Sequence, residues 1–181
     1  LDDLAFLQYT GGTTGVAKGA MLSHGNMVAN VLQSNERIES SFLQGRGTLI
    51  TALPLYHIFA LTANCLLFLR LGWRNILIVN PRDFPAFVKE LKRYPFQFIS
   101  GVNTLFNALL HTPGFDKLDF STLRVTLGGG MAVQETVAKR WKAVTGKVLT
   151  QAWGLTETSP AACINIPNVD FNGSIGLPIS S

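Results

Sequence analysis

The sequence predicts an α/β protein in which a mostly parallel sheet is covered by helices on both faces. Short runs rich in β-branched and aromatic residues alternate with longer stretches of helical periodicity, as in βαβ units. Glycine-rich segments follow several of these runs, where ligands of such sheets bind. The chain has 181 residues, 47% of them apolar and 14% charged, which suffices for a core and excludes a disordered chain.

The first half of the chain begins with a strand that leads directly into a loop of glycines and threonines. Ser23 has a side chain suited to cap the helix that follows. Pro54 ends a later strand, because proline cannot donate a backbone hydrogen bond. The expected elements are a strand over 4–9, a helix from Ser23 to about Ile38, a strand over 48–53, a helix over about 59–69 and a strand over 75–79.

The second half repeats the alternation. Asp83 or a neighbouring residue supplies a helix cap, and Pro85 lies near the first turn, where proline is tolerated. The expected elements are a helix over about 85–93, a strand over 96–100, a helix to about 110, a polar loop over 111–121, a strand over 123–127, a helix over about 133–144 and a strand over 147–152. After Thr158 the pattern weakens, and residues 175–181 show no clear closing element.

The strongest functional signal is the segment YTGGTTGVAKG at residues 9–19. Its glycines let the backbone approach an anion and point successive N–H groups at it. Its threonine hydroxyls add donors and Lys18 adds a positive charge, so the segment suits a polyphosphate. It is not a Walker A loop, because Lys18 lies between Ala17 and Gly19, and it lacks the spacing of GxGxxG. A solvent loop without a ligand is the alternative interpretation.

A second signal is the segment QAWGLTETSP at 151–160, which follows a predicted strand. The indole of Trp153 offers a flat face on which a purine can stack. Glu157 supplies an oxygen ligand of the kind that Mg²⁺ takes when it bridges a carboxylate and a phosphate. The alternative is a core tryptophan beside a solvated glutamate.

Two weaker signals accompany these. His57 lies in the apolar segment LPLYHIFAL at 53–61, where a histidine is commonly part of the core. The glycines at 128–130 follow another strand and suit either a tight turn or a flat surface for a ligand. Other catalytic patterns are missing, since the sequence has no GxSxG elbow, no HExxH and no cluster of paired carboxylates.

In this order, the four segments resemble those of the adenylate-forming superfamily of acyl-CoA synthetases, luciferases and peptide-synthetase adenylation domains. The segment YTGGTTGVAKGAMLSH is similar to that family's phosphate-loop signature, and LPLYHIFAL and GLTETSP are similar to its next signatures. The likeness covers essentially the whole chain. With VNTLFNALL and GSIGLP included, the sequence looks most like bacterial long-chain fatty-acid–CoA ligases.

The resemblance implies a two-step reaction. A fatty carboxylate attacks the α-phosphate of Mg-ATP to give an acyl-adenylate and pyrophosphate, and the thiol of coenzyme A then displaces AMP. In such chemistry the protein positions crowded anions and neutralises their charge. The implied catalytic residues are Lys18, His57, Thr156 and Glu157, with Glu157 as the ligand of Mg²⁺.

The resemblance also implies where the ligands lie. The implied nucleotide-binding residues are Thr10, Gly11, Gly12, Thr13, Thr14, Gly15, Lys18, Gly128, Gly129, Gly130, Trp153, Gly154 and Thr156. The implied substrate-binding residues are Tyr56, His57, Phe59, Gly101, Val102, Thr104 and Leu105. Trp153 stands where the family usually has tyrosine, and Leu61 stands where some long-chain ligases have a gating tryptophan.

The resemblance further implies that residues 1–181 are one fragment of the large AMP-binding domain, without the small C-terminal domain and inactive alone. The expected partners are a fatty acid, ATP and coenzyme A. Nucleic acid is not expected, because the net charge of +4 forms no dense basic stripe. The apolar window 58–71 is too short and too interrupted to span a membrane, so a buried helix is expected there.

Several alternatives stay open. Another carboxylate-activating enzyme, for a medium-chain, aryl or amino acid, would carry the same motifs, although the apolar pocket candidates favour a fatty chain. A nucleotide-binding module without catalysis is the alternative from a different class, which the presence of Lys18 and Glu157 disfavours. The expected location is the cytoplasm, with peripheral attachment to the inner face of the membrane and a homodimer of the parent protein as open options.

Overall fold

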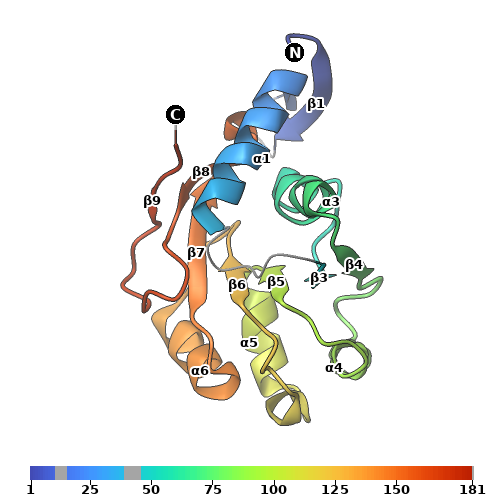
Figure 1. The fold of residues 1–181 in the computed structure, drawn as a ribbon, viewed down its shortest axis with the longest axis vertical. Helices are drawn as coiled ribbons and strands as arrows, with labels where there is room; N and C mark the ends of the chain where they lie inside the picture. Colours follow the sequence, from blue (N-terminus) through green and yellow to red (C-terminus); the bar gives the residue numbers. More distant parts are fainter. Residues whose placement is uncertain (11–15, 39–45, 181) are drawn as a thin grey trace.

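A computed structural model describes residues 1–10, 16–38 and 46–180. Its centre is a seven-stranded sheet with the order β4-β3-β5-β6-β7-β8-β9 (Figure 1). The parallel strands are β4 (Arg74–Leu77), β3 (Thr48–Thr51), β5 (Phe98–Gly101), β6 (Val125–Gly128) and β7 (Leu149–Gly154). The short strands β8 (Ala161–Ile164) and β9 (Leu177–Pro178) extend the sheet in antiparallel fashion. The prediction of a mostly parallel sheet is confirmed.

Helices cover both faces of the sheet (Figure 1). One face carries α4 (Phe84–Leu91), α5 (Asn103–His111) and α6 (Glu135–Thr145). The other face carries α1 (His24–Ile38) and a continuous helical segment made of α2 (Ile58–Ala60), the π-helical turn η2 (Leu61–Leu66) and α3 (Leu67–Leu71). Neighbouring strand residues point into separate cores, since Leu49 packs with the second set of helices and Ile50 with the first.

The helix ends follow the capping signals in the sequence. The Ser23 side-chain oxygen accepts a hydrogen bond from the backbone N–H of Asn26 at 3.2 Å. Asp83 accepts one from the backbone N–H of Ala86 at 3.1 Å, at the start of α4. Gly146 ends α6 in the left-handed conformation, with φ of 71°, which glycine adopts without strain. Both caps confirm the predicted helix starts.

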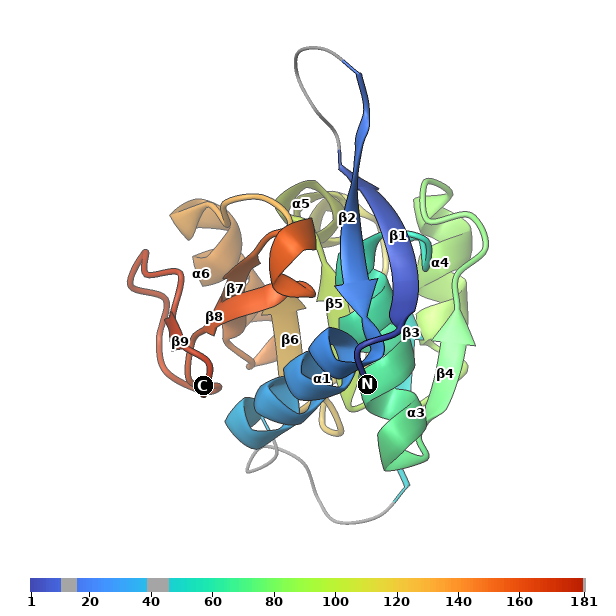
Figure 2. The same ribbon diagram turned by 90° about the horizontal axis from the view of Figure 1, so that it is seen from above.

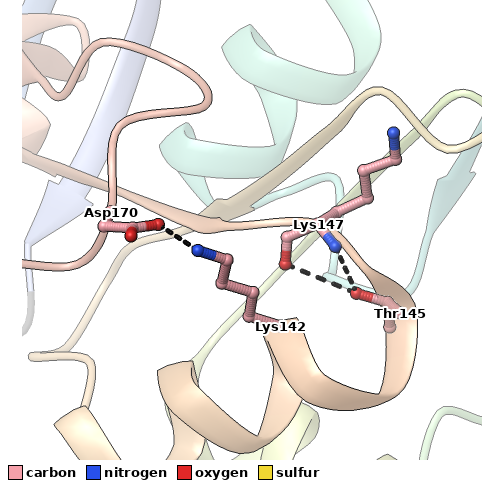
Figure 3. Close-up of polar contacts among 4 residues, drawn as sticks. All are labelled: Lys142, Thr145, Lys147 and Asp170. Atoms are coloured by element: carbon pink, nitrogen blue, oxygen red, sulfur yellow. Dashed lines mark hydrogen bonds and ion pairs between the residues drawn. The ribbon is translucent and has the colours of Figure 1, made fainter.

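Polar contacts also fix the turn between α6 and β7 (Figure 3). The hydroxyl oxygen of Thr145 accepts a hydrogen bond from the backbone N–H of Lys147 at 3.1 Å, and the hydroxyl donates to the carbonyl of Trp141 at 2.8 Å. Lys142 pairs with Asp170 of the loop before β9 at 2.5 Å. This exposed pair joins α6 to the far edge of the sheet.

A separate two-stranded ribbon differs from the prediction. Here β1 (Leu4–Thr10) pairs antiparallel with β2 (Lys18–Ser23), apart from the main sheet (Figures 1 and 2). The sequence predicted the first strand but not its partner, because β2 runs directly into α1 and mixes glycine, alanine and a charge. The strands β8 and β9 were also missed, since they are short and depend on pairing with β7.

The order in which the chain adds strands to the sheet reverses between β3 and β5, which are parallel neighbours. From β3 the chain passes over one face through the segment 58–71 to β4, whereas from β5 it passes over the other face through α5 to β6. Open α/β sheets bind ligands outside the carboxyl ends of their strands at such a point. Within the described residues, no helix has the length and apolarity needed to cross a membrane.

Candidate functional site

A cavity of about 660 Å³ lies at the carboxyl ends of β6 and β7, on the face of the sheet that carries α1. Segments far apart in the sequence form its wall: the ribbon, α1, the segment after β3, the glycines after β6 and the connection from β7 to β8. The predicted site residues that line it are Thr10, His57, Phe59, Gly129, Gly130, Trp153, Gly154, Thr156 and Glu157.

The segment from Trp153 to Glu157 forms one side of the cavity. Trp153 lies near the end of β7 and is 43% exposed, so its ring is not a core side chain. Thr156 begins η4 (Thr156–Thr158), which is one turn of 3-10 helix, and Glu157 is exposed on this turn. At Gly154 a Cβ would lie 1.9 Å from the carbonyl oxygen of Pro160, so only glycine fits there. The tight turn therefore places the indole and the carboxylate on the same cavity.

The glycines after β6 form a flat second side. A Cβ on Gly129 would lie 3.1 Å from the ring of Phe59, and Gly130 has a positive φ of 75°. The following backbone is fixed by buried Gln151, whose side-chain oxygen accepts a hydrogen bond from the N–H of Val133 at 2.9 Å. A flat backbone surface beside an exposed indole suits a planar ring.

His57 is exposed at the cavity and is not a core histidine. It caps α2, where its Nδ1 accepts a hydrogen bond from the backbone N–H of Phe59 at 3.2 Å. In the neutral ring the proton therefore lies on Nε2. The side chain thus retains one N–H donor for an anionic group.

The ribbon brings the phosphate-loop segment to the same place. Both of its strands contact η4, and Gln8 donates a hydrogen bond from Nε2 to the carbonyl of Tyr56 at 2.9 Å. Thr10 and Lys18 are paired across the ribbon, where the Thr10 hydroxyl donates to the Lys18 carbonyl at 3.2 Å. The predicted phosphate ligands Gly11, Gly12, Thr13, Thr14 and Gly15 lie outside the described residues.

Some predicted residues lie elsewhere. The predicted site residues that the structure describes but that do not line the cavity are Lys18, Tyr56, Gly101, Val102, Thr104, Leu105 and Gly128. Leu105 packs into the core on the opposite face of the sheet, and Thr104 is exposed on α5. Val102 borders the glycine surface, because its side chain lies 3.4 Å from where a Cβ of Gly130 would be. The roles assigned to these residues stay predictions.

The sequence interpretation missed three buried polar residues that line the cavity: Asn30, Ser34 and Thr62. Asn30 and Ser34 lie on the face of α1 that also holds Met27, Val31 and Ile38. Polar residues at the helical spacing of a buried face are a usable signal, because burying an amide or hydroxyl costs free energy unless it is hydrogen-bonded.

Deeper between α1 and the segment 58–71, the cavity becomes aliphatic. Its lining there includes Ile38, Leu67, Leu127 and Ile164, all of them buried. This inner part is suited to an apolar chain, whereas the mouth carries the carboxylate, the indole and the imidazole.

Few side chains on the cavity wall could bind a metal ion. Within the described part of the chain, no three His, Cys, Asp or Glu side chains form a group that could hold a metal ion. Among those residues, Glu157 is the only carboxylate on the cavity wall. One carboxylate fits Mg²⁺, which commonly takes one or two carboxylates and completes its shell with substrate phosphates and water.

Comparison with known proteins places this geometry in a family. The family described as AMP-binding enzyme matches residues 1–181. The chain belongs to the AMP-binding enzyme family. The resemblance stated from the motifs is therefore confirmed, and the α/β fold agrees with it.

Within this family, the chain is 59% identical over 181 residues to a long-chain-fatty-acid–CoA ligase of Escherichia coli O6:H1, a match over 99% of this chain and 32% of the relative. It is 58% identical over 184 residues to the Haemophilus influenzae protein of the same name, over 98% and 32%. The crystal structure of ATP-bound MatB from Rhodopseudomonas palustris superposes with a TM-score of 0.82 at 30% identity, over 99% of this chain and 34% of that chain. The chain thus spans about a third of the length of these relatives.

Proposed function

We propose that this chain belongs to an enzyme that activates a long-chain fatty acid with ATP and passes the acyl group to coenzyme A. The observation that carries the proposal is the cavity, whose polar mouth holds Glu157, His57 and Trp153 and whose inner part is aliphatic. The 59% identity to a long-chain-fatty-acid–CoA ligase supports the same substrate class. The relatives are about three times as long, which supports the further proposal that residues 1–181 are one part of the large domain of a longer parent.

The proposed arrangement assigns each ligand to one side of the cavity. The adenine of ATP lies against Gly129 and Gly130 with Trp153 at its edge, and the triphosphate extends toward η4 and the end of the ribbon. The fatty chain lies in the aliphatic part between the helices. Its carboxylate then lies near His57, at the junction of the two parts.

In the first step a carboxylate oxygen bonds to the α-phosphorus, and the bond from that phosphorus to the pyrophosphate oxygen breaks. Both reactants are anions, so the protein must hold them together and supply positive charge or donors. The Nε2–H of His57 and the hydroxyl of Thr156 supply donors at the reacting groups. Lys18 adds charge from the base of the phosphate loop. Glu157 would hold Mg²⁺, which supplies further charge to the phosphates when bound.

The test is pyrophosphate release from ATP by the full-length parent with palmitate, followed by detection of acyl-CoA when coenzyme A is added. The expected result is release that depends on palmitate. A panel of medium-chain, aryl and amino acids separates the proposal from other carboxylate-activating enzymes. No release with palmitate would refute the fatty-acid assignment, and ATP binding without release for any acid would favour a non-catalytic module. The cytoplasmic location, membrane attachment and a homodimer stay predictions.

A further inference from the structure

The turn that carries Glu157 is hydrogen-bonded to a residue of α1. Asn30 is 3% exposed, and its Nδ2 donates hydrogen bonds to the carbonyls of Thr158 at 3.0 Å and Ala161 at 2.8 Å. Its Oδ1 accepts a hydrogen bond from the backbone N–H of Ala161 at 3.2 Å. One side chain thus fixes both ends of the segment that directly follows Glu157, from a helix more than 100 residues earlier in the chain.

A second helix holds the middle of the same segment. The hydroxyl of Thr62, which is 1% exposed on η2, donates to the carbonyl of Ser159 at 3.1 Å. Ser159 has a positive φ of 73°, a backbone conformation that is uncommon for residues other than glycine. The carbonyls of Thr158, Ser159 and Ala161 therefore all accept hydrogen bonds from the two helices that enclose the cavity.

The turn has little support of its own. It is a single 3-10 turn with no buried residue, and Leu155 and Glu157 are both exposed. Within the turn, the backbone N–H of Leu155 donates to the Thr158 hydroxyl oxygen at 2.9 Å and to the Pro160 carbonyl at 3.1 Å. These bonds close the turn but do not fix its position relative to the cavity.

We propose that Asn30 is a positioning residue, which sets the place of Glu157 by holding the segment Thr158–Ala161 against α1. Both amide protons of Asn30 are used by backbone carbonyls, so the residue acts through the turn and not by donating to a substrate. This inference rests on the proposed function only in treating Glu157 as the residue that meets Mg-ATP. It does not depend on which acid is activated.

Asn35 provides a matched control on the same helix. It is also a buried asparagine, 8% exposed, but it does not line the cavity, and its Oδ1 has no hydrogen-bond partner within the described residues. Replacing either asparagine by alanine removes a buried amide from α1. Only the change at residue 30 removes hydrogen bonds to the segment Thr158–Ala161.

The experiment compares Asn30→Ala with Asn35→Ala in the full-length parent. For each variant one measures kcat and the KM values for Mg-ATP and acid in pyrophosphate release, ATP affinity by calorimetry with and without Mg²⁺, and Tm. For Asn30→Ala we expect a loss of about 10- to 100-fold in kcat/KM for Mg-ATP, the usual cost of removing a partner that orients a metal ligand. The KM for the acid should change less than about threefold, and the loss of ATP affinity should be larger with Mg²⁺ than without it.

Thr62→Val gives a second test if Asn30→Ala does not fold, because valine keeps the shape of threonine and removes only the bond to Ser159. We expect it to change the same parameters by a smaller factor. The proposal is overturned if Asn30→Ala, or Thr62→Val in its place, lowers Tm as Asn35→Ala does but leaves kcat/KM and Mg-ATP affinity at the wild-type level. Failure of the wild-type parent to use palmitate would refute the proposed substrate instead, since the calorimetric comparison with ATP would still test Asn30.

Discussion

The two faces of the sheet are packed differently. The face under α4, α5 and α6 is filled by aliphatic and aromatic side chains, among them Phe106, Phe115 and Trp141, each at most 1% exposed. The face under α1 and the segment 58–71 encloses the cavity and holds the buried polar residues Asn30 and Thr62. The first face is thus closely packed, while the second combines a packed core with a cavity and buried polar groups.

The largest expected effect on stability comes from a substitution in the closely packed face. Trp141 is fully buried, contacts Phe106 with ring centroids 4.8 Å apart and donates from its indole N–H to the Thr126 hydroxyl oxygen at 3.1 Å. Trp141→Ala should lower the free energy of unfolding by about 3–5 kcal/mol. Urea denaturation of the parent measures this. Trp141→Phe, which keeps a ring, should lose clearly less, and equal losses would contradict the packing argument.

The next effect belongs to the cavity face and should leave stability alone. Glu157→Gln removes the charge from an exposed side chain, so Tm should stay unchanged. Pyrophosphate release should fall by about 100- to 1000-fold, because the carboxylate that would hold Mg²⁺ is lost, and with it positive charge at the reacting phosphates. Higher Mg²⁺ should restore part of the activity. A variant as active as the wild type would refute the proposed role of Glu157.

A smaller effect tests the aliphatic part of the cavity. Ile164→Phe adds volume where Ile164 lines the inner wall beside Leu127. If the fatty chain lies there, kcat/KM for palmitate should fall by about 10- to 100-fold while octanoate is affected less, since one methylene group in such a pocket is worth about 1–3 kcal/mol. Leu4→Phe, at an exposed position on the ribbon, is the control. An equal loss for both acids would indicate a general disturbance.

The smallest effect concerns pH and the outer surface of the packed face. The Lys139 ammonium, which hydrogen-bonds to Glu135 at 2.8 Å, lowers the pKa of that carboxyl below its usual value. The pair therefore stabilises the fold above the pKa of Glu135 in the unfolded chain, and this contribution is lost as the pH falls through the lower folded-state pKa. Glu135→Gln should lower Tm slightly at neutral pH, and the difference should vanish in acid. A difference that grows in acid would contradict the assigned direction.

The regular elements of the fold could be predicted because their signals are local. Ser23 and Asp83 mark helix starts through caps that need only three following residues. The ribbon partner β2 and the strands β8 and β9 could not be predicted in this way, since their hydrogen bonds come from segments that only the folded chain brings together. The π-helical turn η2 was not predicted either, because the sequence pattern indicated an ordinary helix over about 59–69.

The site divides in the same way. Trp153 and Glu157 were found because their segment carries recognisable chemistry next to a strand end, whereas His57 and Gly129 were assigned to the site through the family resemblance. Asn30 was not found, because its role depends on contacts with residues 128 and 131 positions away. Motif chemistry is thus readable from the sequence, whereas the groups that hold a motif in place are defined by the packing of helices around it.

The turn bound by both α1 and η2 has a consequence for the width of the cavity. The two helices are the side walls of the aliphatic cavity, and their bonds to the turn measure 2.8–3.2 Å. A contact of about 3.6 Å is no longer a hydrogen bond, so the walls can separate by only a few tenths of an ångström before the longest of these bonds is lost. The turn therefore couples the spacing of α1 and η2 to its own position, because a movement that widens the cavity also loosens the segment that follows Glu157.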